Sequence, residues 1–444
     1  MDKYPKQETE APTDVTQRQT SYRRSRWDWA EATIWTDNML TALENGVKGN
    51  KWFSLIDKVH KPNTLSVAWT KVQANKGAAG IDRVTIERFT EHSRKYLDEL
   101  ENDIKSGKYV PKAVKRVYIP KGQGKMRPLG IPCVIDRIAQ QAVKLVIEPI
   151  FENEFSDTSF GFRPKRGAKD ALREVDRLIK EGYTYVVDAD LESYFDTISH
   201  PKLMDKLRRY ISDGKILELI ELWLKQSIME ECREWNPTQG TPQGGVLSPL
   251  LANLYLHDLD TVITEAGGKM IRYADDFVIL NKSQEEAENM LNKVREWVTI
   301  NELKLHPEKT HVGNCLIKGQ GFEFLGYRFE SGNRTVRNKS CQKFRDKVKT
   351  MTARSCGKSI SQIIRNLNPM MRGWYEYFKH VNHKYGLETQ DSFVRRRLRA
   401  ILMRQEKKPG FGKTIKAHMK WPNVYFAKLG LFVMENNRRL EITC

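Results

Sequence analysis

Two adjacent aspartates at the tip of an apolar hairpin constrain the fold of this chain more than any other feature. Asp275 and Asp276 interrupt residues 270–280, which read as a strand, a turn and a second strand. A third acid, Asp190, ends the apolar strand pattern of 185–190. Carboxylates held together in a dry site repel one another unless a cation neutralises them. The pattern therefore predicts that strand ends meet around a bound cation.

Carboxylate ligands of this kind suit Mg²⁺, which keeps part of its water shell and completes it with substrate phosphates. Two such ions roughly 3.5–4 Å apart stabilise both the attacking and the leaving oxygen of a displacement at phosphorus. Any one of these aspartates taken alone would more often be a helix cap or a turn residue. The adjacent pair together with the strand-ending acid predicts metal ligands.

Around these acids the chain reads as mixed helix and strand. Apolar residues recur at helical spacing, for example at Leu65, Ala68 and Val72. Strands alternate with helices and carry acids at their ends, which predicts a compact α+β body. Residues 1–50 are polar and form either a mobile extension with one short aromatic-basic helix or a segment that docks on the body. Further helices are expected at about 86–105, 136–148, 167–181, 201–228, 248–265 and 283–300.

The positive charge is distributed unevenly. The 444-residue chain has a formal net charge of +19, from 75 Lys and Arg against 56 Asp and Glu. Residues 331–444 contain 26 of the basic and 7 of the acidic residues, whereas 1–330 contain 49 of each. The last quarter is therefore expected to hold a polyanion. A second basic run, 104–127, has eight Lys and Arg and no acid, and reads as a hairpin that either contacts phosphates or is simply solvated.

The cysteines and the apolar runs limit where the protein acts. Six cysteines include no CxxC pair, which argues against a disulfide framework and against a cysteine zinc site. No apolar run approaches the ~18 residues that span a bilayer, and the first twenty residues lack the apolar core of a signal peptide. We therefore expect a cytoplasmic, reduced protein that does not bind membranes.

Several blocks of the sequence resemble the group II intron reverse transcriptases, also called maturases. Residues 273–276 (Tyr-Ala-Asp-Asp) look like the YxDD box of reverse transcriptases, and 190–196 resemble their first catalytic box. Residues 239–250 are similar to their nucleotide-binding loop and the helix after it. The other family blocks are 127–132 with Asp136 and Arg137, 159–164, 321–327 and 372–378. The resemblance spans about 52–430 in the family's order.

The resemblance makes Asp190, Asp275 and Asp276 the catalytic carboxylates, which would hold two Mg²⁺ ions, or Mn²⁺ in their place. By analogy Asp190 and Asp275 are the stronger ligands. Asp188 shares a strand face with Asp190, but it does not match the catalytic position and is expected to be structural. Asp196 matches a family position outside the metal-binding set.

The same resemblance implies a dNTP pocket. Phe195 matches the aromatic gate beneath the incoming sugar, where a ring would clash with a 2′-hydroxyl. Lys115 and Arg137 match basic positions that contact the triphosphate, and Lys115 stands where some relatives have arginine, so it offers a point charge. Gln243 would contact the nucleotide, and Gly244 would let the backbone approach closely.

The basic quarter is expected to form helices at 341–353, 360–380 and 391–405, and Pro369 must kink or restart the second. The second helix carries an apolar stripe that predicts core packing. A membrane-surface role for the third helix is conceivable, but RNA is the favoured partner. The residues expected to contact nucleic acid are Arg127, Arg365, Arg372, Lys379, Arg395, Arg396, Arg397 and Arg399.

Two histidines raise the alternative of a nuclease. His380 and His383 could suggest a metal site, but solvent-facing or capping roles are preferred. The sequence ends at Cys444 without the Cys/His zinc-nuclease tail of some relatives. The chain is therefore identified as a bacterial-type member without an HNH endonuclease.

Together these features predict a right-hand polymerase of the α+β class. We expect a polar extension at 1–51, fingers at 52–182, a palm at 183–330 and a basic thumb/maturase domain at 331–444. Its reaction would be RNA-directed DNA synthesis, which extends a primer 3′-hydroxyl with dNTPs.

The expected partners are an RNA template, a DNA or RNA primer, group II intron RNA and target DNA, bound by a monomer or homodimer. As a maturase the protein would promote splicing and retrotransposition. Two alternatives stay open: a domesticated reverse transcriptase in DNA repair or defence, and an RNA-binding splicing factor with little polymerase activity.

Overall fold

The structure is a computed structural model, and it describes residues 25–435 except 123–124, 232, 354–356 and 383–384. The chain divides into two compact units. Unit 1 runs up to Gly167 and also contains Asp190–Asp275 and Asn292–Pro307. Unit 2 contains Ala168–Ala189, Asp276–Leu291 and the chain from Glu308 onward. The predictions for residues 1–24 and for His383 lie outside the described residues.

Helices dominate unit 1, and α7 (Val134–Glu154) is its central helix. Most α7 residues are buried, because α2, α3, α4, α6 and α12 all pack against it. The other helices of the unit are α2 (Asp37–Asn45), η1 (Lys48–Asn50), α3 (Ile56–Val59), α4 (Pro62–Ala74), α5 (Ile86–Glu91), α6 (Ser93–Ser106), α9 (Tyr194–Thr197), α10 (His200–Tyr210), α11 (Gly214–Leu224) and α12 (Ser248–Glu265).

The N-terminal segment docks on α7 at a proline. Helix α7 continues through Pro149, past the end predicted at 148. A proline has no N–H to donate to the carbonyl four residues earlier, which here belongs to Leu145. The indole Nε1 of the fully buried Trp35 donates to that carbonyl oxygen at 3.1 Å. Residues 25–50 therefore dock on the body of the protein, which is the second of the two alternatives that the sequence left open.

A four-stranded sheet in unit 1 has the order β2-β1-β4-β5. β1 (Val114–Gly122) and β2 (Lys125–Ile131) form the antiparallel hairpin that the basic run predicts. β4 (Ile228–Glu230) lies parallel to β1, and β5 (Arg233–Trp235) completes the sheet.

Unit 2 contains two groups of strands. β7 (Asp276–Asn281), β3 (Tyr185–Asp190) and β8 (His311–Asn314) are neighbours in that order, and β3 is antiparallel to β8. α8 (Ala168–Lys180) packs on β7, and α13 (Gln284–Ile300) begins in this unit. The second group is the antiparallel sheet of β9 (Phe322–Phe324), β10 (Tyr327–Glu330) and β11 (Asn333–Val336).

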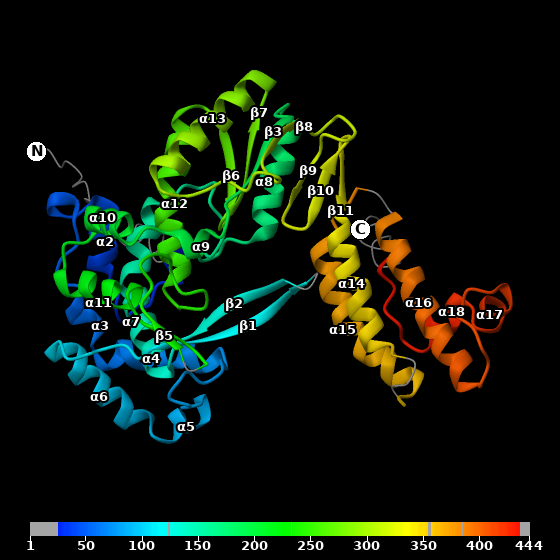
Figure 1. The fold of residues 1–444 in the computed structure, drawn as a ribbon, viewed down its shortest axis with the longest axis horizontal. Helices are drawn as coiled ribbons and strands as arrows, with labels where there is room; N and C mark the ends of the chain where they lie inside the picture. Colours follow the sequence, from blue (N-terminus) through cyan, green and yellow to red (C-terminus); the bar gives the residue numbers. More distant parts are fainter. Residues whose placement is uncertain (1–24, 123–124, 232, 354–356, 383–384, 436–444) are drawn as a thin grey trace, which may run out of the picture. The chain divides into compact units, whose positions relative to one another are not determined.

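The C-terminal part of unit 2 is helical. α14 (Asn338–Met351), α15 (Ile360–Phe378) and α16 (Tyr385–Gln405) pack against one another, and α17 (Ile415–Lys420) and α18 (Asn423–Lys428) follow (Figure 1). The predicted apolar stripe of α15 is largely core: its members Ile363, Ile364, Leu367, Met371 and Phe378 are buried, whereas Met370, Trp374 and Tyr377 are half-buried. The helix continues through Pro369, so it does not restart there. Among the described helices, none combines the length and the hydropathy needed to cross a membrane.

Candidate active site

The turn that carries Asp275 is packed tightly from one side. Asp275 follows β6 (Lys269–Tyr273) and Ala274, whose φ of 61° lies in the left-handed region. The backbone of Gly161 lies directly against this turn, since a Cβ at Gly161 would be 2.2 Å from the Ala274 nitrogen. Two backbone hydrogen bonds hold the segment before Gly161 along β6: Phe160 N to Arg272 O at 2.8 Å and Arg272 N to Thr158 O at 3.0 Å. The family block 159–164 therefore forms one wall of the turn that carries Asp275.

Asp190 is the last residue of β3 and is also held through its backbone. Its carbonyl oxygen accepts a hydrogen bond from His306 N at 2.8 Å, and Leu191 bridges to Leu305. These contacts fix the direction in which the chain leaves the strand. Asp188, two residues earlier on the same strand face, lies within 3.5 Å of the Glu323 amide, which agrees with a structural role.

The three predicted catalytic aspartates are half-exposed. Across the described part of the chain, no group of three or more His, Cys, Asp or Glu residues is arranged to hold a metal ion by itself. Mg²⁺ in phosphoryl-transfer sites takes only one or two protein carboxylates and completes its shell with water and substrate phosphates.

Gln243 stands at the centre of a polar network in unit 1. Its side-chain oxygen accepts from Arg127 Nε at 2.6 Å, and its Nε2 donates to Asp196 Oδ2 at 3.0 Å. Its carbonyl oxygen accepts from Gly130 N at 2.7 Å. The network therefore holds the predicted nucleotide-binding loop against both β2 and α9, and it defines the orientation of the Gln243 amide.

The glycine after Gln243 has no room for a side chain. Gly244 has a φ of 115°, and a Cβ there would lie 2.2 Å from the Gly130 carbonyl oxygen. Phe195 is half-buried beside this loop, and its carbonyl oxygen accepts from Thr241 N at 2.7 Å. Its ring meets that of Phe162 edge-on at 6.4 Å. The predicted aromatic gate and the predicted loop are thus neighbours.

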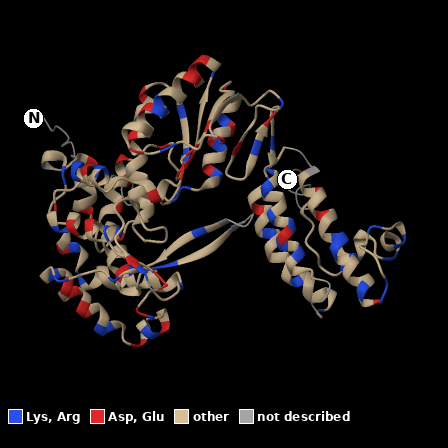
Figure 2. Cartoon of the chain, in the orientation of Figure 1, with Lys and Arg blue, Asp and Glu red and all other residues tan. Residues whose placement is uncertain are grey.

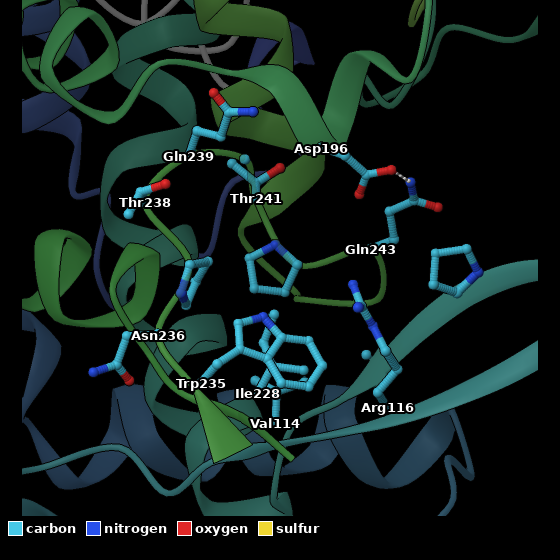
Figure 3. A pocket seen from close by; sticks show the side chains of 15 residues that line it. Val114, Arg116, Asp196, Ile228, Trp235, Asn236, Thr238, Gln239, Thr241 and Gln243 are labelled. Carbon is cyan, nitrogen blue, oxygen red and sulfur yellow. Dashed lines mark hydrogen bonds between the residues drawn. The ribbon is translucent and has the colours of Figure 1, made fainter. Parts of the chain in front are cut away.

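A cavity of about 300 Å³ opens beside this loop (Figure 3). It is lined by β1, β2, β4, β5 and residues 236–243. In Figure 3 the Arg116 side chain extends from β1 toward Gln243. The Arg116 guanidinium carbon lies 5.1 Å from the ring centroid of Trp235. The basic residue of β1 in this cavity is therefore Arg116; Lys115, its exposed neighbour, is not among the lining residues, because successive strand side chains point to opposite faces.

Arg137 is buried in unit 1 and is already bonded to the backbone. Its Nε donates to the Pro132 carbonyl oxygen at 2.9 Å, and its Nη2 donates to the Ala78 carbonyl oxygen. Burial lowers the pKa of the Arg137 guanidinium. The structure thus gives Arg137 a role in joining the start of α7 to the loop before α5, and its triphosphate contact stays a prediction.

The preceding residue, Asp136, is a buried acid whose role the sequence did not indicate. It accepts from the Tyr109 hydroxyl at 2.7 Å and from Lys112 N at 3.2 Å. Burial raises the pKa of Asp136 to about 6.

The predicted RNA-binding residues of α15 reach the surface. Lys and Arg lie along α14–α16 with few acids between them (Figure 2). Arg365 and Arg372 are exposed, and the Arg372 guanidinium lies 4.5 Å from the Phe432 ring centroid. Lys379 is half-buried and pairs with Glu376 at 3.1 Å. His380 is exposed, as expected.

The arginines of α16 do not form one exposed row. Arg399 is 2% exposed and donates to the Trp421 carbonyl oxygen at 2.9 Å and to Asn423 Oδ1 at 2.8 Å. Arg397 donates to the Thr352 carbonyl oxygen at 2.6 Å. These two side chains join α16 to its neighbours. The burial of Arg399 and the hydrogen bonds of both arginines disfavour the predicted RNA contact. Arg395 and Arg396 are half-buried.

Comparison with known proteins decides the family. A family model described as reverse transcriptase (RNA-dependent DNA polymerase) matches residues 119–329, and one described as the group II intron maturase-specific domain matches 341–421. Protein YkfC of Escherichia coli K12 is 33% identical over 315 residues, which cover 62% of this chain and 82% of YkfC. The chain belongs to the group II intron reverse transcriptase/maturase family.

A second relative extends well beyond the region that aligns with this chain. Group II intron-encoded protein LtrA of Lactococcus lactis subsp. cremoris is 39% identical over 215 residues, covering 48% of this chain and 35% of LtrA. Against LtrA, the chain thus aligns over about a third of the relative's length. A solved chain of a partial Cas6-RT-Cas1–Cas2 complex is 28% identical with a TM-score of 0.36, covering 55% of this chain and 42% of that chain.

As a member of this family the chain is a reverse transcriptase with the α+β right-hand polymerase fold. Its maturase-type helices carry the excess positive charge that the sequence locates in 331–444.

Sequence reasoning also missed a polar network beside the turn of this reverse transcriptase. The guanidinium of Arg272 on β6 bonds to Asp260 and Asn253 of α12, and it also donates to the carbonyl oxygen of Ala274. The only signal in the sequence is an arginine inside an otherwise apolar strand, three residues before Asp275.

Proposed function

We propose that this reverse transcriptase extends a primer 3′-hydroxyl with dNTPs on an RNA template, and that it binds group II intron RNA to promote splicing and retrotransposition. Asp190, Asp275 and Asp276 are the catalytic carboxylates. The observations that carry the proposal are the tight packing of the YADD turn against the 159–164 block and the backbone anchoring of Asp190 at the end of β3.

The donor set fits two divalent ions. All three side chains are carboxylates, the ligands that Mg²⁺ prefers, and all are half-exposed, so water and phosphate oxygens can reach them. Asp190 and Asp275 are the principal ligands. When bound, the ions would lower the pKa of the primer hydroxyl and offset the charge of the leaving pyrophosphate.

The residues around Gln243 bind the incoming nucleotide. Arg127 and Asp196 hold the Gln243 amide from both sides, so its orientation is set before the nucleotide arrives. The absent side chain of Gly244 lets the loop backbone pack closely against the Gly130 carbonyl, and Phe195 excludes a 2′-hydroxyl. Arg116, which lines the adjoining cavity, contributes positive charge in addition to the exposed Lys115.

Fingers at 52–182, a palm at 183–330 and a thumb at 331–444 share the work of binding nucleic acid. The exposed Arg365 and Arg372 offer guanidinium groups to phosphates, which gives affinity that depends on salt and little on sequence. Specificity for intron RNA would come from RNA shape and loops.

The experiment is extension of oligo(dT) on poly(rA) with Mg²⁺. The variant Asp275→Asn/Asp276→Asn should lose cDNA synthesis and retain RNA binding, because amides keep the size of the side chains and remove the charge. Asp188→Asn is the matched control on the same sheet, and it should copy RNA as the unaltered protein does. Normal copying by the double variant would refute the site assignment.

Intron function needs a separate test. The genomic sequence around the reading frame should fold into group II intron domains, and the purified protein should accelerate splicing of that RNA. Absence of an intron together with full polymerase activity would favour a domesticated reverse transcriptase. Splicing without polymerase activity would favour the RNA-binding splicing factor.

A further inference from the structure

A fully buried guanidinium lies beneath the turn that carries Asp275. Arg272 and Asp260 are both 0% exposed. Arg272 Nε donates to Asp260 Oδ1 at 2.7 Å, and Nη2 donates to Asp260 Oδ2 at 2.5 Å. This bidentate pair neutralises the buried charge. It leaves the third nitrogen, Nη1, for other acceptors.

Nη1 reaches the turn itself. It donates to the Ala274 carbonyl oxygen at 3.0 Å and to Asn253 Oδ1 at 2.9 Å. The Ala274 carbonyl belongs to the peptide that precedes Asp275. Because a peptide group is planar, holding this oxygen fixes the orientation of the peptide plane that contains the nitrogen and Cα of Asp275.

The same network also holds the 159–161 segment, which packs against the turn. Asn253 Nδ2 donates to the Gly161 carbonyl oxygen at 2.7 Å. Gly161 in turn lies against the Ala274 nitrogen, where no side chain fits. Arg272 and Asn253 therefore tie α12 to both sides of the turn.

The turn needs such support because Ala274 is strained. A non-glycine residue in the left-handed region is conformationally unfavourable and persists only where its surroundings determine it. If Arg272 served only packing, its ion pair with Asp260 would satisfy it. Apolar residues of similar volume often replace such buried pairs without loss of stability. The additional bond to the Ala274 oxygen gives the arginine a further role.

We propose that Arg272 is a positioning residue that sets the direction of the Asp275 carboxylate, with Asp260 neutralising it and Asn253 joining it to Gly161. This inference rests on the proposed role of Asp275. It predicts that loss of the Arg272 bond changes how the site uses Mg²⁺ even where the fold is kept.

The test separates positioning from stability. The variant Arg272→Met/Asp260→Leu removes both charges together and leaves none buried alone. We expect its melting temperature to stay near that of the unaltered protein, its kcat on poly(rA)/oligo(dT) to fall about 10²-fold, and its Mg²⁺ concentration for half-maximal rate to rise several-fold. Primer–template affinity should not change.

The matched control is Lys206→Met/Asp258→Leu, which removes another ion pair of unit 1; Lys206 is buried, Asp258 is half-buried, and Lys206 contacts Asp258, Tyr255 and Trp297 rather than the turn. It should keep both kcat and the Mg²⁺ dependence. Arg272→Lys retains the charge but replaces the three guanidinium nitrogens with a single ammonium nitrogen, so its kcat should fall between those of the unaltered protein and the double variant. It provides the same comparison if the double variant does not fold.

Unchanged kcat and Mg²⁺ dependence in a folded Arg272→Met/Asp260→Leu protein would overturn the inference. The same result for Arg272→Lys would do so if only that variant folds. Activity in Asp275→Asn/Asp276→Asn would instead overturn the proposed site, so the two failures are distinguishable. Mn²⁺ binding measured by electron paramagnetic resonance should weaken in the Arg272 variant and stay unchanged in the control.

Discussion

Gly161→Ala should impair catalysis through contact with the backbone of the catalytic turn. The new Cβ would lie 2.2 Å from the Ala274 nitrogen and 2.8 Å from the Tyr273 carbonyl carbon. Ordinary contacts of a Cβ begin near 3.4 Å, so one of the two segments must move by roughly 1 Å. All the atoms in contact belong to the backbone, which gives way less easily than the end of a side chain.

The 159–161 segment cannot easily be the one that moves. Backbone bonds to Arg272 hold the residues before Gly161, and Asn253 holds its carbonyl. The strain should therefore fall on the turn and displace Asp275. Overpacking of this kind costs about 1–3 kcal/mol of stability, and a displacement of about 1 Å at a catalytic group can cost 10²-fold in rate.

The assay is steady-state dTTP incorporation on poly(rA)/oligo(dT), with thermal melting measured in parallel. Gly214→Ala is the matched control, because a Cβ at Gly214 meets nothing within 4 Å. We expect kcat to fall about 10²-fold for Gly161→Ala, with little change in dTTP KM, and to stay constant for the control. A Gly161→Ala protein with unaltered kcat would refute the reasoning.

Two further predictions concern stability and RNA binding. The folded-state pKa of Asp136, about 6, lies above the ordinary aspartate value of 3.8, so the folded protein keeps this proton at pH values where the unfolded chain releases it. The free energy of unfolding should therefore fall by up to about 3 kcal/mol as pH rises from about 4 to 6. Urea titrations at several pH values should show a smaller fall for Asp136→Asn. An equal dependence of the unfolding free energy on pH in both proteins would contradict the prediction. Arg365→Ala/Arg372→Ala should weaken RNA binding and reduce the slope of log K against log salt by about 1 for each phosphate that is no longer bound. Filter binding at several salt concentrations checks this, and an unchanged slope would show that these arginines do not bind phosphates.

Much of the site follows from local sequence. The strand-ending Asp190, the YADD turn and the Pro-Gln-Gly-Gly loop are short patterns whose chemistry depends on neighbours in the chain. The helices of the basic quarter were also predictable, because the period of the apolar residues reports which face is buried.

Hydrogen bonds between residues far apart in the sequence could not be predicted. Arg137 and Arg399 look like phosphate-binding residues in the sequence, yet both are buried and bonded to carbonyl oxygens. An arginine binds a carbonyl or a phosphate with the same donors, so only its surroundings decide between them. Arg116, and not the predicted Lys115, lines the cavity for a similar reason: side chains alternate between the two faces of a strand, and the fold decides which face meets the cavity.

The sequence by itself determined the family, the order of the catalytic blocks and the location of the excess charge, because each depends on residue identity and spacing alone. The tertiary structure decided which partners complete the site. Trp35 reaches the carbonyl that Pro149 leaves free, and Asn253 reaches Gly161 across 92 positions of the chain. A buried polar group must find a partner wherever the fold supplies one. That requirement joins the turn before Asp275 to α12, and no local pattern in the sequence indicates it.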